Sequence, residues 1–129
     1  MTATTASDPV VVDSSGWLEY LTEGEKAEAF APYLADDRVV IVPSVVIYEV
    51  RKILALKKSK TLADMFISNA LRRTIASFDD DLAVKSAELS VGYKLAMADA
   101  IIYATANHFQ VELITADSHF ANLPGVTVL

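Results

Sequence analysis

The sequence contains no cysteine, only two histidines and only four glycines in 129 residues. The lack of cysteine excludes disulfides, zinc–thiolate centres and cysteine nucleophiles, and it favours a reducing compartment. No acid stands near His108 or His119 in a usual zinc-binding arrangement, so we expect both to be surface or helix-end residues. No apolar stretch approaches the roughly 20 residues of a membrane span, and the first residues do not resemble a signal peptide. We therefore expect a cytoplasmic protein without membrane association.

The composition is that of a folded domain. Hydrophobic residues make up 53% of the chain and mean hydropathy is +0.33, which is incompatible with extensive disorder. No linker, repeat or low-complexity segment divides the chain. We expect a flexible N-terminus over residues 1–8 and a single domain over residues 9–129.

Short apolar runs alternate with amphipathic stretches along the chain. Strands are predicted at Val10–Val12, Val39–Val42, Ile75–Phe78, Leu113–Thr115 and Val126–Val128. Helices are predicted at residues 14–22, 25–35, 61–73, 82–91 and 97–108, and a further helix is predicted to begin at a Ser44 cap. Met65 and Leu71 are expected on the apolar face of the helix at 61–73, and Gly92 is expected to end the helix at 82–91. This alternation predicts a three-layer α/β/α fold with a central, mostly parallel sheet, in which ligands bind beyond the carboxyl ends of the strands.

Four acidic residues lie where the chain is otherwise apolar: Asp13, Glu49, Asp99 and Asp117. A buried, unpaired carboxylate costs several kcal/mol, so four such positions in a small chain point to a shared site. Asp13 and Asp117 follow predicted strands, but each also has an ordinary structural explanation, as a helix N-cap or a turn residue.

Glu49 and Asp99 are harder to explain structurally. Val46 and Ile53 place Glu49 on the core side of its predicted helix. Asp99 is the only charged residue from Leu95 to Asn107, and a helix N-cap is its one structural alternative. Four carboxylates in one crevice would repel one another unless a cation lay between them. Oxygen ligands of this kind suit Mg²⁺ or Mn²⁺.

The net charge of −6 conceals a basic segment. Seven of the eleven basic residues lie between positions 51 and 73, where Asp64 is the only acid. The segment is either a solvated helical surface or a patch that follows a phosphate backbone. Its members are Arg51, Lys52, Lys57, Lys58, Lys60, Arg72 and Arg73.

The four acidic motifs, in this order and at these intervals, resemble those of PIN-domain proteins, and in particular VapC toxins of bacterial toxin–antitoxin modules. The segments are Val-Val-Val-Asp13-Ser-Ser, Val-Val-Ile-Tyr-Glu49-Val, Met-Ala-Asp99-Ala-Ile-Ile-Tyr-Ala-Thr-Ala and Leu-Ile-Thr-Ala-Asp117. The resemblance covers about Val10 to Leu129, and the Asp99 motif is its most specific part.

The resemblance implies a role for each acid. Asp13 and Asp99 would be the principal ligands of Mg²⁺ or Mn²⁺, with Glu49 and Asp117 completing the catalytic site. Ser15 and Thr115 match hydroxyl residues that support such sites, although a helix cap and a strand residue are their structural alternatives. Some relatives carry another acid at the place of His119, which leaves a second metal position open.

The resemblance also implies an activity and partners. The expected activity is cleavage of single-stranded RNA to 5′-phosphate and 3′-hydroxyl ends by a metal-activated water. The expected partners are a cognate antitoxin and a second copy of the chain. Candidate contact residues are Trp17, Tyr20, Leu21 and Phe30, although core packing is the more common explanation of aromatic residues on helices. Two alternatives stay open: a PIN-like module that binds RNA or protein without cleaving, and a phospho-acceptor or phosphatase domain with Asp13 as nucleophile.

Overall fold

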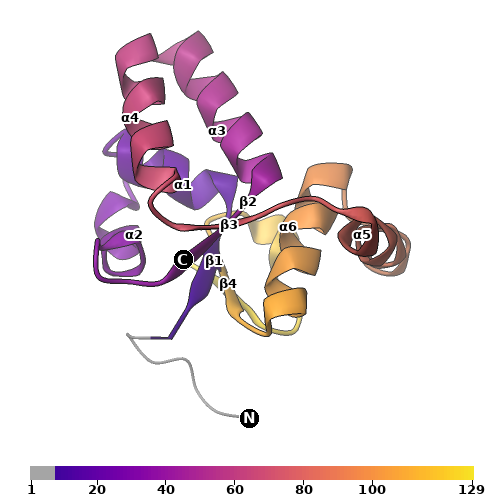
Figure 1. Ribbon diagram of the computed structural model, residues 1–129. Coiled ribbons are helices and arrows are strands. Elements are labelled where there is room, and N and C mark those ends of the chain that lie inside the picture. Colours follow the sequence, from indigo (N-terminus) through magenta and orange to yellow (C-terminus); the bar gives the residue numbers. More distant parts are fainter. Residues whose placement is uncertain (1–7) are drawn as a thin grey trace.

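The computed structural model describes residues 8–129. The flexible terminus expected over residues 1–8 therefore lies, for residues 1–7, outside the described residues. Five strands and six α-helices alternate along this part of the chain (Figure 1). In chain order they are β1 (Val10–Val12), α1 (Ser14–Leu21), α2 (Ala27–Leu34), β2 (Val40–Pro43), α3 (Ser44–Lys57), α4 (Lys60–Ala70), β3 (Thr74–Ala76), α5 (Asp80–Tyr93), α6 (Met97–Phe109), β4 (Glu112–Thr115), the 3₁₀ turn η1 (Ser118–Phe120) and β5 (Val126–Val128).

The strands form one parallel sheet in the order β3-β2-β1-β4-β5. Strand β1 is central, with Val11 beside Ile41 of β2 and Leu113 of β4. Helices α1 to α4 cover one face and α5 with α6 cover the other (Figure 1). The predicted three-layer α/β/α fold is confirmed, and every strand pair in the described chain is parallel.

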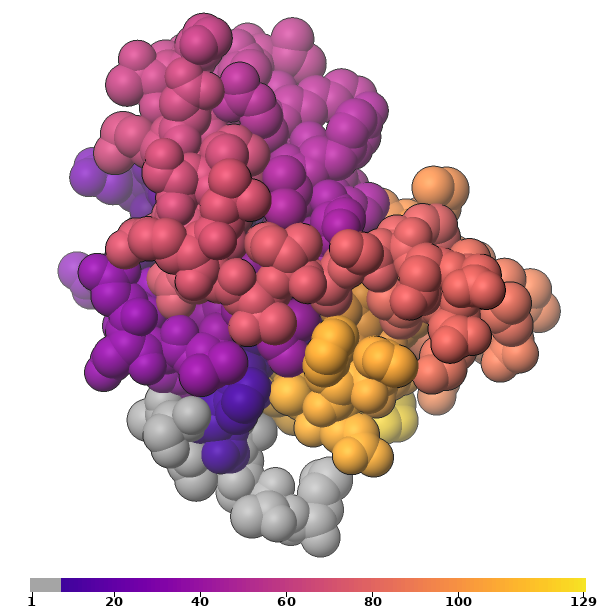
Figure 2. All heavy atoms as spheres, in the orientation of Figure 1, coloured from indigo at the N-terminus to yellow at the C-terminus, as the bar shows by residue number. Residues whose placement is uncertain are grey.

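The core explains the apolar runs of the sequence. All three valines of β1 are fully buried because helices pack on both faces of the sheet. Trp17 of α1 and Phe66 of α4 meet edge to face, with ring centroids 5.3 Å apart, beneath the first helical layer. The two helices of each connection pack together, and the pair α3 and α4 projects beyond the sheet as a distinct lobe (Figure 2).

Several predicted boundaries were wrong. Gly92 does not break its helix, since α5 continues to Tyr93 and ends at Lys94 in a left-handed conformation, with φ 58°. Ser44 does not cap α3: Pro43 is the N-cap, and the Ser44 hydroxyl donates to the Ala76 carbonyl oxygen at 3.2 Å.

The third strand and the fourth helix are also shifted. Strand β3 begins at Thr74 and ends at Ala76, before the predicted Phe78, because Asp79 caps the next helix through the Leu82 N–H. Helix α4 ends at Ala70, and Met65 and Leu71, expected on its apolar face, are exposed. In the described residues, no helix has both the length and the apolar character needed to cross a bilayer.

Gly16 allows the closest approach between α1 and its surroundings. A Cβ atom at this position would lie 2.5 Å from Cε1 of Phe30 and 2.6 Å from Cγ1 of Val12. We expect Gly16→Ala to lower the free energy of unfolding by about 2 kcal/mol, because both neighbours are fixed in the core. Urea denaturation measures this change.

The matched control is Gly92→Ala in α5, where an added methyl group would meet no atom within 4 Å. That variant should be as stable as the wild type or more stable by up to ~1 kcal/mol, because alanine favours the helix. Equal effects of the two substitutions would contradict the packing described around Gly16.

Candidate active site

Asp13 lies directly after β1 and is 4% exposed. Its Oδ1 accepts hydrogen bonds from the Ser15 hydroxyl at 2.7 Å and from the Gly16 N–H at 3.1 Å. Its Oδ2 accepts from the Thr115 hydroxyl at 2.6 Å. Asp13 is therefore the N-cap of α1 and is also hydrogen-bonded to β4. Its role as a helix N-cap and its position in the acidic cluster are compatible.

Ser15 and Thr115 extend this network. The Asp117 N–H donates to the Thr115 hydroxyl at 2.9 Å, and the Ala116 N–H donates to the Ser15 hydroxyl at 3.1 Å. The two hydroxyls thus connect Asp13 to the backbone that carries Asp117. Asp13 and Asp117 are about 100 residues apart in the sequence, and the pairing of β1 with β4 brings them together.

Glu49 reaches the same place from the first turns of α3. Its Oε1 accepts a hydrogen bond from the Ser14 hydroxyl at 2.6 Å. Ser14 was not identified from the sequence as a partner of Glu49, because the two residues are 35 positions apart and meet only in the folded chain. The one available signal was the pair of serines that directly follows Asp13.

Asp99 is the third residue of α6 and is not its N-cap, which is Ala96. No group of residues 8–129 donates a hydrogen bond to its carboxylate. A partly buried carboxylate without a donor stands out in a structure where Asp13 accepts three hydrogen bonds.

Asp117 follows β4 and faces Asp99. Its Oδ1 accepts from the His119 N–H at 2.8 Å and lies 3.2 Å from Nδ1 of the His119 ring. Ligand atoms of Asp99, Asp117 and His119 all lie within 4.8 Å of one another. The His119 side chain is 81% exposed, as predicted for a surface residue, but the structure places it on the rim of the acidic cluster.

The charges of the cluster act on one another. Burial, and then the negative charges of Asp117, Glu49 and Asp13, raise the pKa of Asp99 above 3.8. Burial also raises the pKa of Asp13, against the lowering effect of its hydrogen bonds from Thr115, Ser15 and Gly16. All four predicted acids therefore contribute to one electrostatic site.

The potential ligand atoms of this site are carboxylate oxygens, which suit a hard divalent ion. Carboxylate oxygens are the ligands that Mg²⁺ and Mn²⁺ prefer, and the unpaired Asp99 carboxylate offers both of its oxygens. A carboxylate has about four lone-pair positions, so Asp13 keeps one for a cation beside its three hydrogen bonds. Asp13, Asp99 and Asp117 would hold the ion, with Glu49 directly or through water.

The predicted basic residues fall into two groups. The group on α3 and the start of α4 is largely exposed: Lys52, Lys57, Lys58 and Lys60 are open to solvent, and Arg51 is half-buried. Asp64 pairs with two members, with Arg51 at 3.0 Å and with Lys60 at 3.1 Å. The other three lysines make no ion pair in the part of the chain that the structure describes.

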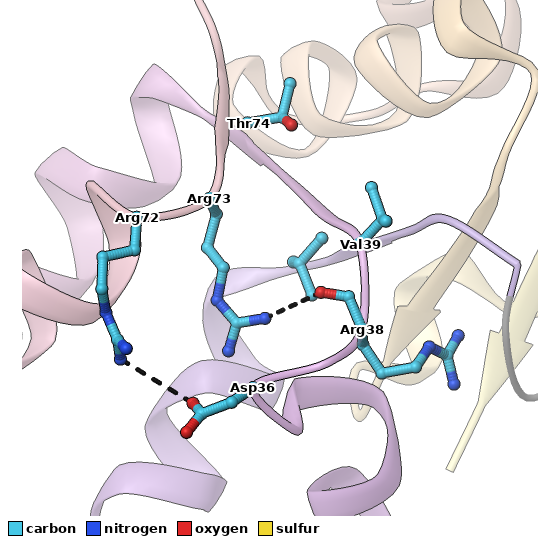
Figure 3. A pocket seen from close by; sticks show the side chains of 7 residues that line it. Asp36, Arg38, Val39, Arg72, Arg73 and Thr74 are labelled. Atoms are coloured by element: carbon cyan, nitrogen blue, oxygen red, sulfur yellow. Dashed lines mark hydrogen bonds and ion pairs between the residues drawn. The ribbon is translucent and has the colours of Figure 1, made fainter.

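Arg72 and Arg73 form the second group and line a pocket with Asp36 and Arg38 (Figure 3). They precede the amino end of β3, whereas Asp13 follows the carboxyl end of the parallel strand β1, so the two lie at opposite ends of the sheet. The Arg73 guanidinium donates to the carbonyl oxygens of Leu34, Ala35 and Arg38 at 2.7 to 3.1 Å. Burial lowers the pKa of Arg73. Arg72 lies 3.7 Å from Asp36 in the same pocket.

Two of the candidate partner-contact residues are in the core. Trp17 and Phe30 have no exposed surface, whereas Tyr20 and Leu21 are partly buried. For Trp17 and Phe30 the structure therefore confirms the alternative of core packing and excludes a contact with a partner.

The fold and the site together define a class: a parallel α/β protein with a cluster of acidic residues at the carboxyl ends of β1 and β4 that could hold a metal ion. The family model of the PIN domain matches residues 10–126, so the chain belongs to the PIN-domain family. The predicted family is confirmed. In a comparison with curated proteins, no sequence matched the chain.

Solved structures agree with this assignment. A toxin–antitoxin complex from Klebsiella pneumoniae contains a chain 26% identical to this one, with a TM-score of 0.77 over 92% of this chain and 96% of that chain. VapC20 of Mycobacterium tuberculosis, described as a toxin that cleaves the sarcin–ricin loop, is 18% identical, with a TM-score of 0.74 over 92% and 98%. VapBC2 from Rickettsia felis, bound to promoter DNA, is 16% identical, with a TM-score of 0.71 over 95% and 98%.

The repulsion at Asp99 predicts a stability gain when its charge is removed. Because the pKa of Asp99 is higher in the folded chain than its ordinary 3.8, the folded state loses stability as the pH rises through this range. Metal-free Asp99→Asn should therefore be more stable than the wild type at pH 7, by up to ~1 kcal/mol after screening by solvent, or a few degrees in Tm.

Thermal melting in EDTA at pH 7 and at pH 3.5 measures this gain, which should largely disappear at the lower pH. Glu88→Gln, an exposed change on α5, is the control and should leave Tm unchanged. A wild type that is as stable as Asp99→Asn at pH 7 would show that the four carboxylates do not repel one another.

Proposed function

We propose that this protein is a metal-dependent endoribonuclease and the toxin of a toxin–antitoxin pair. The observation that carries the proposal is the unpaired Asp99 carboxylate, held among Asp13, Glu49 and Asp117 at the carboxyl ends of the strands. Membership of the PIN-domain family and the likeness to the Klebsiella pneumoniae complex support it.

Each residue of the site has a distinct part in the proposed reaction. Asp13, Asp99 and Asp117 would hold a divalent ion, Mg²⁺ or Mn²⁺, which when bound would supply an activated water and offset the charge on the scissile phosphate. Glu49 keeps Oε2 free, since only Oε1 accepts from Ser14, and so can orient a water by accepting its hydrogen bond.

Ser15 and Thr115 act as positioning residues. Their hydroxyls both donate to Asp13, and backbone N–H groups of the β4 end donate to them in turn. Asp13 therefore needs no rearrangement before it binds a cation, which is the condition for efficient electrostatic catalysis. The expected products carry 5′-phosphate and 3′-hydroxyl ends.

The α3–α4 lobe supplies the proposed RNA-binding surface. Lys52 lies one turn beyond Glu49 on α3, and Lys57 and Lys58 follow at the end of the helix, about 12 Å from Glu49 along its axis. These unpaired ammonium groups can bind phosphates on one side of the cut and compensate for the acidic site. Arg72 and Arg73 are not included, because their guanidinium groups are engaged at the opposite end of the sheet.

The proposed partners follow from the same comparison. The Klebsiella pneumoniae protein is found in a complex with an antitoxin, and we propose that a cognate antitoxin neutralises this chain as well. We further propose that the chain forms a homodimer and acts in the cytoplasm, where its RNA substrate is found.

Metal-dependent cleavage is the direct test. Purified chain, free of antitoxin, should cut at least one of a panel of structured RNAs, including a sarcin–ricin loop hairpin, in Mg²⁺ or Mn²⁺. EDTA or Asp99→Asn should reduce the rate by about a thousandfold, because several kcal/mol of transition-state stabilisation depend on the bound ion. Denaturing gels with mapping of 5′ ends give the rates and the cleaved sites.

The control variant is Glu88→Gln, which removes an exposed carboxylate from α5 outside the cluster and outside the α3–α4 lobe, and which should retain the wild-type rate within a few fold. If the wild type cuts none of the RNAs, the chain is a non-catalytic PIN-like module that binds RNA or protein. If Asp99→Asn cuts as fast as the wild type, the cleavage does not depend on the acidic site and the proposed mechanism is wrong.

A further inference from the structure

His119 occupies a position that the four-acid site does not account for. Its ring lies on the rim of the crevice, and one of its ligand atoms is within 4.8 Å of those of Asp99 and Asp117. The next residue, Phe120, is fully buried and anchors η1 to the core. The backbone of His119 is also fixed, because its N–H donates to Asp117. The fold therefore fixes the backbone of His119 beside the site, and its exposed ring contacts Asp117 with Nδ1 3.2 Å from Oδ1.

The distance between two potential ligand atoms, one of His119 and one of Asp117, suits a six-coordinate ion. Adjacent ligands of an octahedral ion with bonds of about 2.1 Å lie about 3 Å apart. Nδ1 of His119 and Oδ1 of Asp117 are 3.2 Å apart. One ion can thus bind both atoms with little movement of either side chain, and the unpaired Asp99 carboxylate lies on the same side.

A nitrogen donor changes which ion such a site prefers. Mg²⁺ binds oxygen ligands and keeps several waters, and it gains little from imidazole. Mn²⁺ and the later divalent ions bind imidazole nitrogen as well as carboxylate oxygen. The His119 imidazole also adds no further negative charge to a cluster in which the acids already repel one another.

We propose that His119 is a direct metal ligand, together with Asp99 and Asp117, and that it makes this site select Mn²⁺ over Mg²⁺. The proposal rests on the proposed function, since it concerns the ion of the same site. It assigns His119 a role in metal selectivity, beyond its hydrogen bond to Asp117.

Pulsed electron paramagnetic resonance of the Mn²⁺-loaded chain tests the proposal without any measurement of activity. An imidazole bound to Mn²⁺ produces a nitrogen-14 modulation that carboxylates and water do not. The chain has only two histidines, so a preparation without a histidine tag leaves His108, at the end of α6, as the one other source.

We expect the modulation in the wild type and in the control His108→Gln, and its loss in His119→Asp and His119→Ala. Calorimetric titration should show the ratio of Mn²⁺ to Mg²⁺ affinity falling roughly tenfold in His119→Asp. Because His119 is exposed, both variants should fold, and their melting curves verify this.

Mn²⁺ bound without a nitrogen signal, or an unchanged signal in His119→Asp, would overturn the role of His119 while leaving the nuclease proposal intact. An unchanged affinity ratio in His119→Asp would overturn the selectivity. Failure of the wild type to bind either ion would overturn the role of His119 and the metal-dependent nuclease together.

Discussion

The Asp13 carboxylate connects the end of β1 to the start of α1 and to the end of β4. Through the Gly16 N–H and the Ser15 hydroxyl it fixes the start of α1, and through the Thr115 hydroxyl it is bonded to the end of β4. Burial raises the pKa of Asp13, and each of these donors lowers it by stabilising the ionised form. This network fixes Asp13 at the carboxyl end of the central strand, and the other acids are positioned around it.

A second constraint is the repulsion among the acids. Burial together with three neighbouring carboxylates raises the pKa of Asp99, and nothing in residues 8–129 donates a hydrogen bond to it. Such an arrangement lowers the stability of the metal-free fold, which is typical of sites where function is favoured over stability. The lysines of the α3–α4 lobe are exposed, so the chain presents a local positive charge beside the acidic site despite its net charge of −6.

Much of this could be predicted from the sequence, because local signals were strong. The unbroken Val10–Val12 run indicated a strand buried on both faces, and Asp99 within an apolar helix indicated a special role. The fold class and the family were both confirmed. Features that depend on tertiary contacts could not be predicted from the sequence. Ser14 bonds to Glu49 across 35 residues, and Arg73 is engaged by carbonyl groups of an earlier loop. Gly92 was expected to end a helix, but it is tolerated near the end of α5.

The central claim is that the four carboxylates are held together in order to bind a divalent ion. Melting of the wild type and of Asp99→Asn with increasing Mn²⁺ or Mg²⁺ tests it most directly, because an ion that binds only the folded state stabilises it by about 2.7 kcal/mol at a hundred times its Kd. The account predicts a Tm that rises by several degrees with ion concentration in the wild type and stays nearly constant in Asp99→Asn. A wild-type Tm that does not respond to either ion, or an equal rise in both proteins, would contradict it.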